Sequence, residues 1–316
     1  MKVVFMGTPE FAAICLEEIL NSRHEVVGVI TVPDKPAGRG QKLSQSAVAK
    51  LAHEKNLKLF QPEKLKNPEF IHELELLNAD AFVIVAFRML PKEVWQIPTK
   101  GTFNLHASLL PQYRGAAPIN WAIINGEKET GVTTFLIDEK IDTGNILLKS
   151  QIEILPKDDA GTVHDKLAEV GKKLIIETLN GLENDSIQPQ PQEKPAELKE
   201  APKIFKEDCQ IDWDEDLERI YNKIRGLSPY PVAWTNFVKD GEIKSVKIYK
   251  GHFDTESNST EKSGSISFEN NQLKIQLLQG NYFIEELQIE GKKRMTDKDF
   301  INGIQDKTGW EINQNT

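Results

Sequence analysis

The first half of the chain alternates short apolar runs with stretches of helical periodicity. Strands of a parallel sheet are buried on both faces and therefore appear as nearly continuous apolar runs. We expect strands at Lys2–Met6, Glu25–Val32, Ala79–Phe87, Gly101–His106, Gly131–Ile137 and Ile146–Ile154. A helix follows the first of them, with Pro9 in its first turn, and ends near Leu20. This alternation predicts an α/β class with a Rossmann-like N-terminal domain and a mostly parallel sheet.

A longer helix is expected after the last of these strands. Thr162-Val163-His164-Asp165 has the Ser/Thr-x-x-Asp/Glu form of a capping box, which marks a helix start. Apolar residues then recur at steps of four, three and four, which places them on one helical face: Val163, Leu167, Val170 and Leu174. The pattern predicts one helix that begins near Thr162 and buries one apolar face.

The chain changes character near Gly181. Residues 183–203 are polar and rich in proline, which is typical of an extended linker. Beyond them, Asp214–Ile224 has a helical pattern, and short β-type runs follow at Val232–Phe237, Val246–Tyr249, Ser265–Phe268, Leu273–Leu278 and Tyr282–Leu287. Short strands separated by turn residues predict a small antiparallel β-barrel, OB-like in form. The expected domains are therefore 1–182, a linker at 183–203, and a barrel at 204–316.

Composition narrows the class of protein. The 316 residues are 39% apolar and 28% charged, as in an ordinary globular protein, and the length favours about two domains. Ala81–Phe87 is the longest apolar run and is far shorter than the roughly 18 residues of a membrane span. The N-terminus lacks the pattern of a secretory signal. Two cysteines, Cys15 and Cys209, make no disulfide framework or metal cluster, so we expect a cytoplasmic protein without a metal.

Polar residues whose side chains could take part in catalysis follow two of the expected strands. Asn104 and His106 lie two apart at the end of one strand, so their side chains project to the same face. Asp142 follows the next long strand, within Ile137–Gly144. Open α/β sheets bind ligands at the carboxyl ends of their strands, so we expect these three side chains to share one crevice.

Each of these residues alone has an ordinary structural explanation. A histidine at a strand end can tie down a turn, and Asp-Thr-Gly is a common turn sequence. Together, Asn104 and His106 could donate hydrogen bonds to a developing oxyanion, and Asp142 could relay a proton directly or through one water. No Gly-x-Ser-x-Gly elbow or Cys/His pair offers a nucleophile instead. The case for a catalytic role therefore rests on the combination.

The motifs around these residues resemble a known family. Residues 104–115 read Asn-x-His-x-Ser-Leu-Leu-Pro-x-Tyr-Arg-Gly, and Thr-Gly-Val-Thr and Asp-Thr-Gly follow. This resembles the 10-formyltetrahydrofolate-dependent formyltransferases, and the resemblance implies that Asn104, His106 and Asp142 are catalytic. It also implies a site for the co-substrate 10-formyltetrahydrofolate, whose expected lining is Ser108, Leu109, Leu110, Pro111, Phe87, Arg88 and Leu90. Arg88 departs from the family pattern, in which a small residue is expected.

Further resemblances indicate the formyl acceptor. Phe5–Ala12 and Val32–Lys42 are similar to segments of the family members that act on methionyl-tRNA, as are Phe205–Asp208, Ile211–Trp213 and Ile224–Thr235 in the second half. The resemblance implies formylation of the free amino group of initiator methionyl-tRNA, in the service of translation initiation. The basic loop within Val32–Lys42 is, by its residues alone, either an ordinary solvated loop or a clamp for a phosphate-rich partner. The resemblance implies that this loop meets the tRNA, so Arg39, Lys35 and Lys42 are the expected tRNA contacts, with Arg39 foremost. Nothing in the pattern demands a partner subunit, and we expect a monomer.

The net charge of the second half does not by itself support tRNA binding. From Ala201 to Thr316 the sequence has 16 Lys/Arg against 20 Asp/Glu, whereas nucleic-acid-binding domains are usually basic. Its cations cluster at Lys244/Lys247/Lys250 and at Lys292–Arg294, and each cluster is either an RNA contact or an ordinary solvated face. The overall formal charge of −9 excludes a uniformly basic surface but not such a patch.

The sequence is also compatible with other functions. A formyltransferase acting on an amino sugar nucleotide, or a hydrolase releasing formate, would use the same three residues. A dinucleotide-dependent oxidoreductase would share the Rossmann-like half, but Gly7-Thr8-Pro9-Glu10 is not the Gly-x-Gly-x-x-Gly phosphate cradle. A non-catalytic RNA-binding protein would not depend on Asp142.

Overall fold

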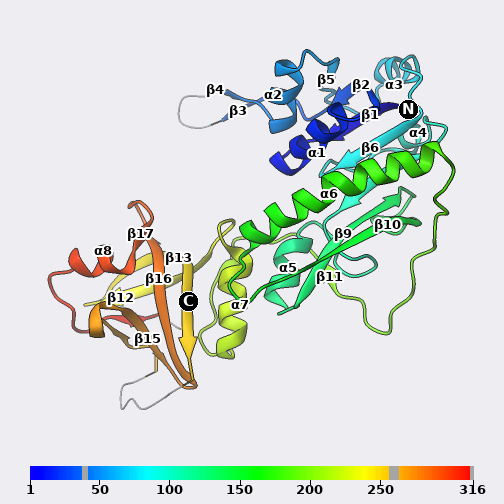
Figure 1. The fold of residues 1–316 in the computed structure, drawn as a ribbon. Helices are drawn as coiled ribbons and strands as arrows, with labels where there is room; N and C mark the ends of the chain where they lie inside the picture. The colour runs from blue at the N-terminus through cyan, green and yellow to red at the C-terminus, as the bar shows by residue number, and fades with distance from the viewer. Residues whose placement is uncertain (38–41, 256–262, 314–316) are drawn as a thin grey trace. The chain divides into compact units, whose positions relative to one another are not determined.

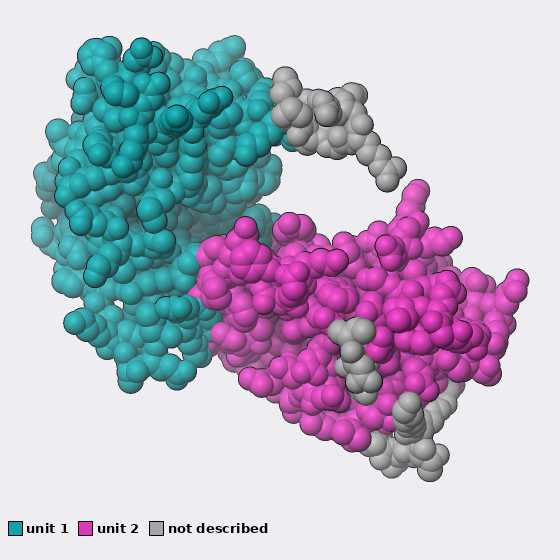
Figure 2. All heavy atoms as spheres, turned by 180° about the vertical axis from the view of Figure 1, so that it is seen from behind, with its two compact units in different colours: residues 1–115, 129–153, 164–200 teal, residues 116–128, 154–163, 201–316 magenta. Residues whose placement is uncertain are grey.

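The computed structural model describes residues 1–37, 42–255 and 263–313 (Figure 1). The chain forms two compact units, coloured separately in Figure 2. The first unit comprises residues 1–115, 129–153 and 164–200, and the second comprises residues 116–128, 154–163 and 201–316. Two segments from the first half of the sequence thus pack with the second unit. The expected domain bounds at 182 and 203 stay a prediction.

The first unit is built on a seven-stranded sheet. Its order is β10 (Ile146–Glu153), β9 (Glu129–Leu136), β7 (Thr102–His106), β6 (Ala81–Val85), β1 (Lys2–Gly7), β2 (Glu25–Ile30) and β5 (Leu59–Phe60). The five strands from β7 to β5 are parallel, and β9 runs antiparallel to both β7 and β10. The sheet confirms the Rossmann-like, mostly parallel prediction. Two short hairpin strands, β3 (Lys35–Ala37) and β4 (Lys42–Ser44), lie outside it.

Helices cover both faces of this sheet. They are α1 (Glu10–Leu20), α2 (Ala47–Glu54), α3 (Pro68–Glu75), α4 (Lys92–Trp95) and α6 (Ala160–Glu183). On one face, Phe70 and Leu74 of α3 and Val94 of α4 join a core with Met6 and Ile84. On the other face α6 packs closely at Gly171, because a Cβ there would lie 2.9 Å from the Leu105 side chain. Helix α6 therefore lies directly against β7, the strand that carries Asn104 and His106.

The expected capping box at Thr162 is wrong. Helix α6 begins at Ala160, so Thr162 lies within its first turn. Asp159 caps the helix instead, since its Oδ1 accepts hydrogen bonds from the Thr162 amide at 2.7 Å and the Thr162 hydroxyl at 2.8 Å. Aspartate ranks at least as high as threonine at this position, and it stands three residues earlier. The predicted apolar face is nonetheless buried at Val163, Leu167 and Leu174.

The second unit is an antiparallel barrel. Its order is β14 (Ile266–Ser267), β15 (Leu273–Leu277), β16 (Gly280–Ile289), β13 (Glu242–Asp254), β12 (Ala233–Lys239) and β18 (Glu311–Ile312), with β17 (Met295–Thr296) beside β16. A bridge between Ser265 and Glu311 joins the two outer strands, which confirms the predicted barrel. Strand β13 is much longer than the expected Val246–Tyr249. Helix α7 (Leu217–Leu227) starts three residues later than expected, because Asp216 accepts from the Glu218 amide and caps it.

The remaining elements are short. They are α5 (Pro118–Ile124), β8 (Arg114–Gly115), β11 (Glu200–Ala201), the 3-10 helices η1 (Glu207–Cys209) and η2 (Glu269–Asn271), and α8 (Asp297–Asn302). Helices α5 and α7 pack on each other within the second unit, where Asn120 Nδ2 donates to Gly226 O at 2.7 Å.

Candidate active site

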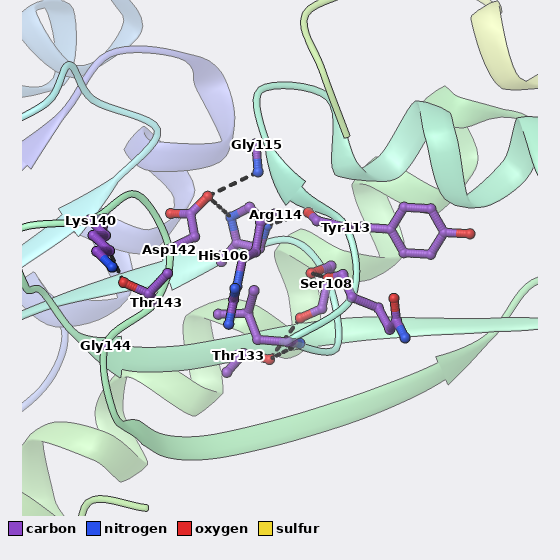
Figure 3. Close-up of polar contacts among 12 residues, drawn as sticks. His106, Ser108, Tyr113, Arg114, Gly115, Thr133, Lys140, Asp142, Thr143 and Gly144 are labelled. Atoms are coloured by element: carbon purple, nitrogen blue, oxygen red, sulfur yellow. Dashed lines mark hydrogen bonds and ion pairs between the residues drawn. The ribbon is translucent and has the colours of Figure 1, made fainter. Parts of the chain in front are cut away.

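His106 is the last residue of β7 and is 6% exposed. Its Nε2 lies 2.8 Å from the carbonyl oxygen of Tyr113. A carbonyl can only accept, so the proton of this hydrogen bond belongs to Nε2. Nδ1 is left facing the Asp142 carboxylate, 3.8 Å from Oδ2 (Figure 3). The backbone of one loop thus fixes which ring nitrogen is presented to the acid.

Asp142 lies in the loop that joins β9 to β10. Its φ is +53°, the left-handed region that few non-glycine residues adopt, although aspartate tolerates it better than most. The backbone amide of Gly115 donates to its Oδ2 at 3.0 Å (Figure 3). Gly144 packs so closely two residues later that a Cβ there would lie 1.7 Å from the Leu136 carbonyl oxygen. A sharply constrained loop therefore aims the carboxylate at His106.

Asn104 is half-buried on β7, in register with Ile84 on one side and Phe135 on the other. Its Oδ1 is buried, and within the described structure this atom has no hydrogen-bond partner. Leaving such an acceptor unsatisfied costs on the order of 1–3 kcal/mol. Buried polar atoms without a partner occur at sites where a ligand supplies the missing hydrogen bond. The structure brings His106 and Asp142 together, and places Asn104 two residues before His106 on the same strand.

The loop Ser108–Tyr113 is held from beneath by Thr133 of β9. The Thr133 hydroxyl donates to the Ser108 carbonyl at 2.7 Å and accepts from the Leu110 amide at 3.1 Å. Ser108 Oγ donates to Gln112 O at 2.6 Å, so this hydroxyl stabilises the loop internally. Thr133 was not among the expected site residues, although it ends the Thr-Gly-Val-Thr motif that carried part of the resemblance.

Within this loop the four expected folate-site residues differ in exposure. Ser108 and Leu110 are fully buried, whereas Leu109 and Pro111 are partly exposed. The Leu109 side chain lies over Gly131, since a Cβ on that glycine would come within 2.5 Å of Leu109 Cδ2. The surface that the loop can offer to a ligand is therefore its backbone, Leu109 and Pro111.

The segment after β6 holds the other three expected folate-site residues. Leu90 is 7% exposed and belongs to the core with Val94. The Arg88 guanidinium donates to the carbonyl oxygens of Glu63, at 3.0 Å, and Pro62, and it lies 5.5 Å from the centre of the Phe87 ring. Burial lowers the pKa of Arg88. This arginine thus ties the segment to the neighbouring loop, which is how the chain accommodates it in place of a small residue.

Gln192 also belongs to this site, although no sequence motif marks it. Its Nε2 donates to the carbonyl oxygens of Asp142, at 2.8 Å, and Gly144, at 2.9 Å. Its Oε1 accepts from Arg114 Nη2 at 2.7 Å and Nε at 3.3 Å. It lies in the stretch expected to be a linker, where no periodic pattern marks individual side chains.

The expected tRNA contacts fall on the β3–β4 hairpin. Lys35 is exposed on β3, and Lys42 begins β4. Arg39 lies outside the described residues. In the barrel, Lys250 pairs with Glu285 at 3.1 Å, Lys244 pairs with Glu242 at 3.3 Å, and Arg294 also pairs with a glutamate. These pairs lower the positive charge that the two lysine clusters can offer to RNA.

Two features are absent from the described residues. No helix within residues 1–37, 42–255 and 263–313 is long and apolar enough to cross a membrane. The same part of the chain holds no group of three or more His, Cys, Asp or Glu side chains arranged to bind a metal ion.

Comparison with known proteins decides the family. Residues 1–179 match the family described as formyl transferase, and residues 203–305 match the formyl transferase C-terminal domain. This chain belongs to the formyl transferase family. The matched N-terminal region of this formyl transferase contains His106, Asp142 and Asn104, while the C-terminal match covers most of the barrel.

Relatives of this formyl transferase extend over its full length. The methionyl-tRNA formyltransferase of Flavobacterium johnsoniae is 51% identical over 305 residues, which are 96% of each chain. That of Bacteroides thetaiotaomicron is 45% identical over 99% of this chain and 98% of the relative.

Solved structures share its fold. HypX from Aquifex aeolicus in complex with tetrahydrofolic acid has a TM-score of 0.64 at 19% identity, over 96% of this chain and 47% of HypX. An N-formyltransferase from Helicobacter canadensis has a TM-score of 0.63 at 21% identity, over 93% of this chain and all of its own. At these identities the likeness concerns the fold.

Proposed function

We propose that this formyl transferase moves the formyl group of 10-formyltetrahydrofolate to the free amino group of initiator methionyl-tRNA. The products are formylmethionyl-tRNA, used in translation initiation, and tetrahydrofolate. The observation that carries the chemistry is the His106–Asp142 pair at the carboxyl end of β7. Methionyl-tRNA as the formyl acceptor is supported by two relatives named methionyl-tRNA formyltransferase, at 51% and 45% identity. Their matches cover 96% and 99% of this chain, and thus both the N-terminal region and the barrel.

In this proposal His106 stabilises the oxyanion that develops as the amine attacks the formyl carbon. Its Nε2 is occupied by Tyr113 O, so Nδ1 is the nitrogen available to the reaction. Because Nε2 already carries a proton, donation from Nδ1 toward the oxyanion uses the imidazolium form of the ring, which lies beside the Asp142 carboxylate in a buried site where such a donor is most effective. Asp142 Oδ2, 3.8 Å from Nδ1, can take up the proton that the attacking amine loses, directly or through one intervening water. The bond from the formyl carbon to the folate nitrogen then breaks, and the proton goes to that nitrogen as tetrahydrofolate leaves.

Asn104 would orient the reacting groups. Its buried Oδ1, which has no hydrogen-bond partner within the described structure, can accept from an N–H of the attacking amine. The amide nitrogen would then be free to donate to the formyl oxygen beside His106. Such alignment of two reactants is worth several powers of ten in rate.

The folate site would be formed by the Ser108–Pro111 loop and Phe87–Leu90. The flat pterin suits an apolar wall with exposed backbone polar groups. Leu109, Pro111 and the loop backbone would provide that wall, while the buried Ser108, Leu110 and Leu90 would hold its shape. Arg88 would fix one edge through its bonds to the Pro62 and Glu63 carbonyls.

The β3–β4 hairpin would contact the phosphate-rich end of the tRNA. Lys35, Arg39 and Lys42 supply cations within eight residues of chain, and binding through them is expected to weaken steeply with salt. We further propose that the protein acts as a monomer in the cytoplasm, which light scattering and fractionation can test.

The proposal is tested with 10-formyltetrahydrofolate and two acceptors, charged initiator tRNA and an amino sugar nucleotide. Formylmethionyl-tRNA should form, and the sugar should remain unmodified. Asp142→Asn should abolish nearly all transfer with tRNA binding retained, because it preserves shape and removes the charge. Asp185→Asn is the matched control, since this aspartate is exposed and pairs with Lys100 on the surface. A formylated sugar without formylated tRNA would refute the proposed acceptor, and an active Asp142→Asn would refute the proposed mechanism.

A further inference from the structure

Residues 190–199, which we name the bracing segment, run along the two loops of the active site. Gln190 forms a backbone bridge with Ile146 at the start of β10, with N–O distances of 2.7 and 2.8 Å. Further along, Lys199 O accepts from the Tyr113 amide at 2.6 Å. Gln112 Nε2 donates to Glu197 O at 2.9 Å, and its Oε1 accepts from the Lys199 amide at 2.7 Å. The segment is thus fixed to both the His106 side and the Asp142 side of the site.

Gln192 lies between these anchor points and uses its whole amide. The two donors of Nε2 are spent on the carbonyl oxygens of Asp142 and Gly144, so both ends of that turn are held. The acceptor Oε1 takes two donors of Arg114, the residue before Gly115. Gly115 in turn donates to the Asp142 carboxylate. Gln192, Arg114, Gly115 and Asp142 therefore form a closed ring of bonds around the catalytic carboxylate.

We propose that Gln192 is a positioning residue for Asp142. The role rests on the proposed function, in which Asp142 handles a proton at His106. Asp142 has a left-handed backbone, and that conformation persists only where the surroundings hold it. Gln192 holds the peptide carbonyl while Gly115 holds the carboxylate, and two attachment points fix a direction that one cannot. The ring nitrogen and the acid are 3.8 Å apart, so a small rotation of the loop would separate them.

Two substitutions of Gln192 test its Nε2 donors and its Oε1 acceptor separately. Gln192→Ala removes all four contacts. Gln192→Glu keeps an acceptor for Arg114 but replaces the two donors with oxygen that faces the Asp142 and Gly144 carbonyls. Both variants should lose about 10- to 100-fold in kcat, the scale of a displacement of about 1 Å in a catalytic group. KM for folate and for tRNA should stay within about threefold, because neither substrate contacts Gln192 in the proposed arrangement.

Gln190→Ala is the matched control. Gln190 is exposed, and its side chain bonds only the nearby Gln188 carbonyl within the described structure, while its bridge to Ile146 is made by backbone atoms that the substitution keeps. This variant should keep the wild-type kcat. Circular dichroism of all variants would check that the sheet is formed.

A double substitution distinguishes positioning from a general structural role. If Gln192 acts through Asp142, adding Gln192→Ala to Asp142→Asn should change the residual rate less than about threefold, since the group being positioned is already lost. A full additional 10- to 100-fold loss in that background would overturn the proposal. So would a Gln192→Glu variant with wild-type kcat, because the Arg114 contact alone would then suffice. Failure of the wild-type protein to formylate tRNA would refute the proposed function itself, which is a separate result.

Discussion

The replacement Thr133→Val tests whether the strand beneath the active-site loop holds it by hydrogen bonds. Valine has nearly the shape of threonine but no hydroxyl. It would leave the Leu110 amide and the Ser108 carbonyl unsatisfied in a place where Thr133 is fully buried. Each unsatisfied buried group costs about 1–3 kcal/mol, so the loss of both bonds should lower the free energy of unfolding by about 2–6 kcal/mol.

Thr133→Ser is the matched comparison. Serine keeps the hydroxyl and removes one buried methyl group, which should cost only about 1 kcal/mol. With a urea m-value of about 2–3 kcal/mol/M, the valine variant should lower the unfolding midpoint by about 1–2 M, and the serine variant by less than half of that.

The assay must report on the first unit. Of the five tryptophans only Trp95 lies there, so fluorescence would mainly follow the second unit. Urea unfolding followed by far-ultraviolet circular dichroism, together with hydrogen exchange at the Leu110 amide, avoids that bias. Exchange at this amide should accelerate in the valine variant alone. Equal stability of the valine variant and the wild type, or equal losses in both variants, would refute the reasoning.

Four further predictions concern the site and the fold. His106→Ala should lower kcat far more than folate affinity in steady-state and binding assays, whereas equal losses would mean that the ring only maintains the pocket. Gly144→Ala should lower kcat by at least tenfold, because its Cβ would clash with the Leu136 carbonyl and displace the loop; a wild-type rate would contradict that geometry. Arg39→Ala should weaken reaction with tRNA and spare folate binding, and loss of folate affinity would count against it. Burial lowers the pKa of His24, so the unfolded chain binds more protons in acid; the urea midpoint should fall as pH drops through about 6.5, and a weaker fall in His24→Gln would assign the effect.

The sequence predicted the parts of the site that depend on local pattern. The run Ala81–Val85 is apolar at every position, and the structure buries all of it as β6. His106 was placed at a strand end, and it is the last residue of β7. Such features follow from side-chain periodicity, which the sequence displays directly.

The contacts that aim the proposed catalytic groups could not be predicted in this way. The tautomer of His106 depends on the Tyr113 carbonyl, and the direction of Asp142 depends on a left-handed backbone and on Gln192, fifty residues along the chain. No repeating pattern links such positions, because the contacts arise only when distant segments pack. The same holds for residues 116–128 and 154–163, which pack with the second unit.

The bracing segment lies late in the chain, so it is synthesised after the sheet whose loops it holds. Every strand of the first sheet is complete once residue 153 has been translated, but Gln192 and Lys199 leave the ribosome only later. The nascent chain therefore contains His106 and Asp142, the proposed catalytic residues, before it contains the segment that holds their loops. A gene fragment that stops at residue 182 would encode a whole sheet with loosely held active-site loops, and one that extends through residue 200 would encode the loops with their supports.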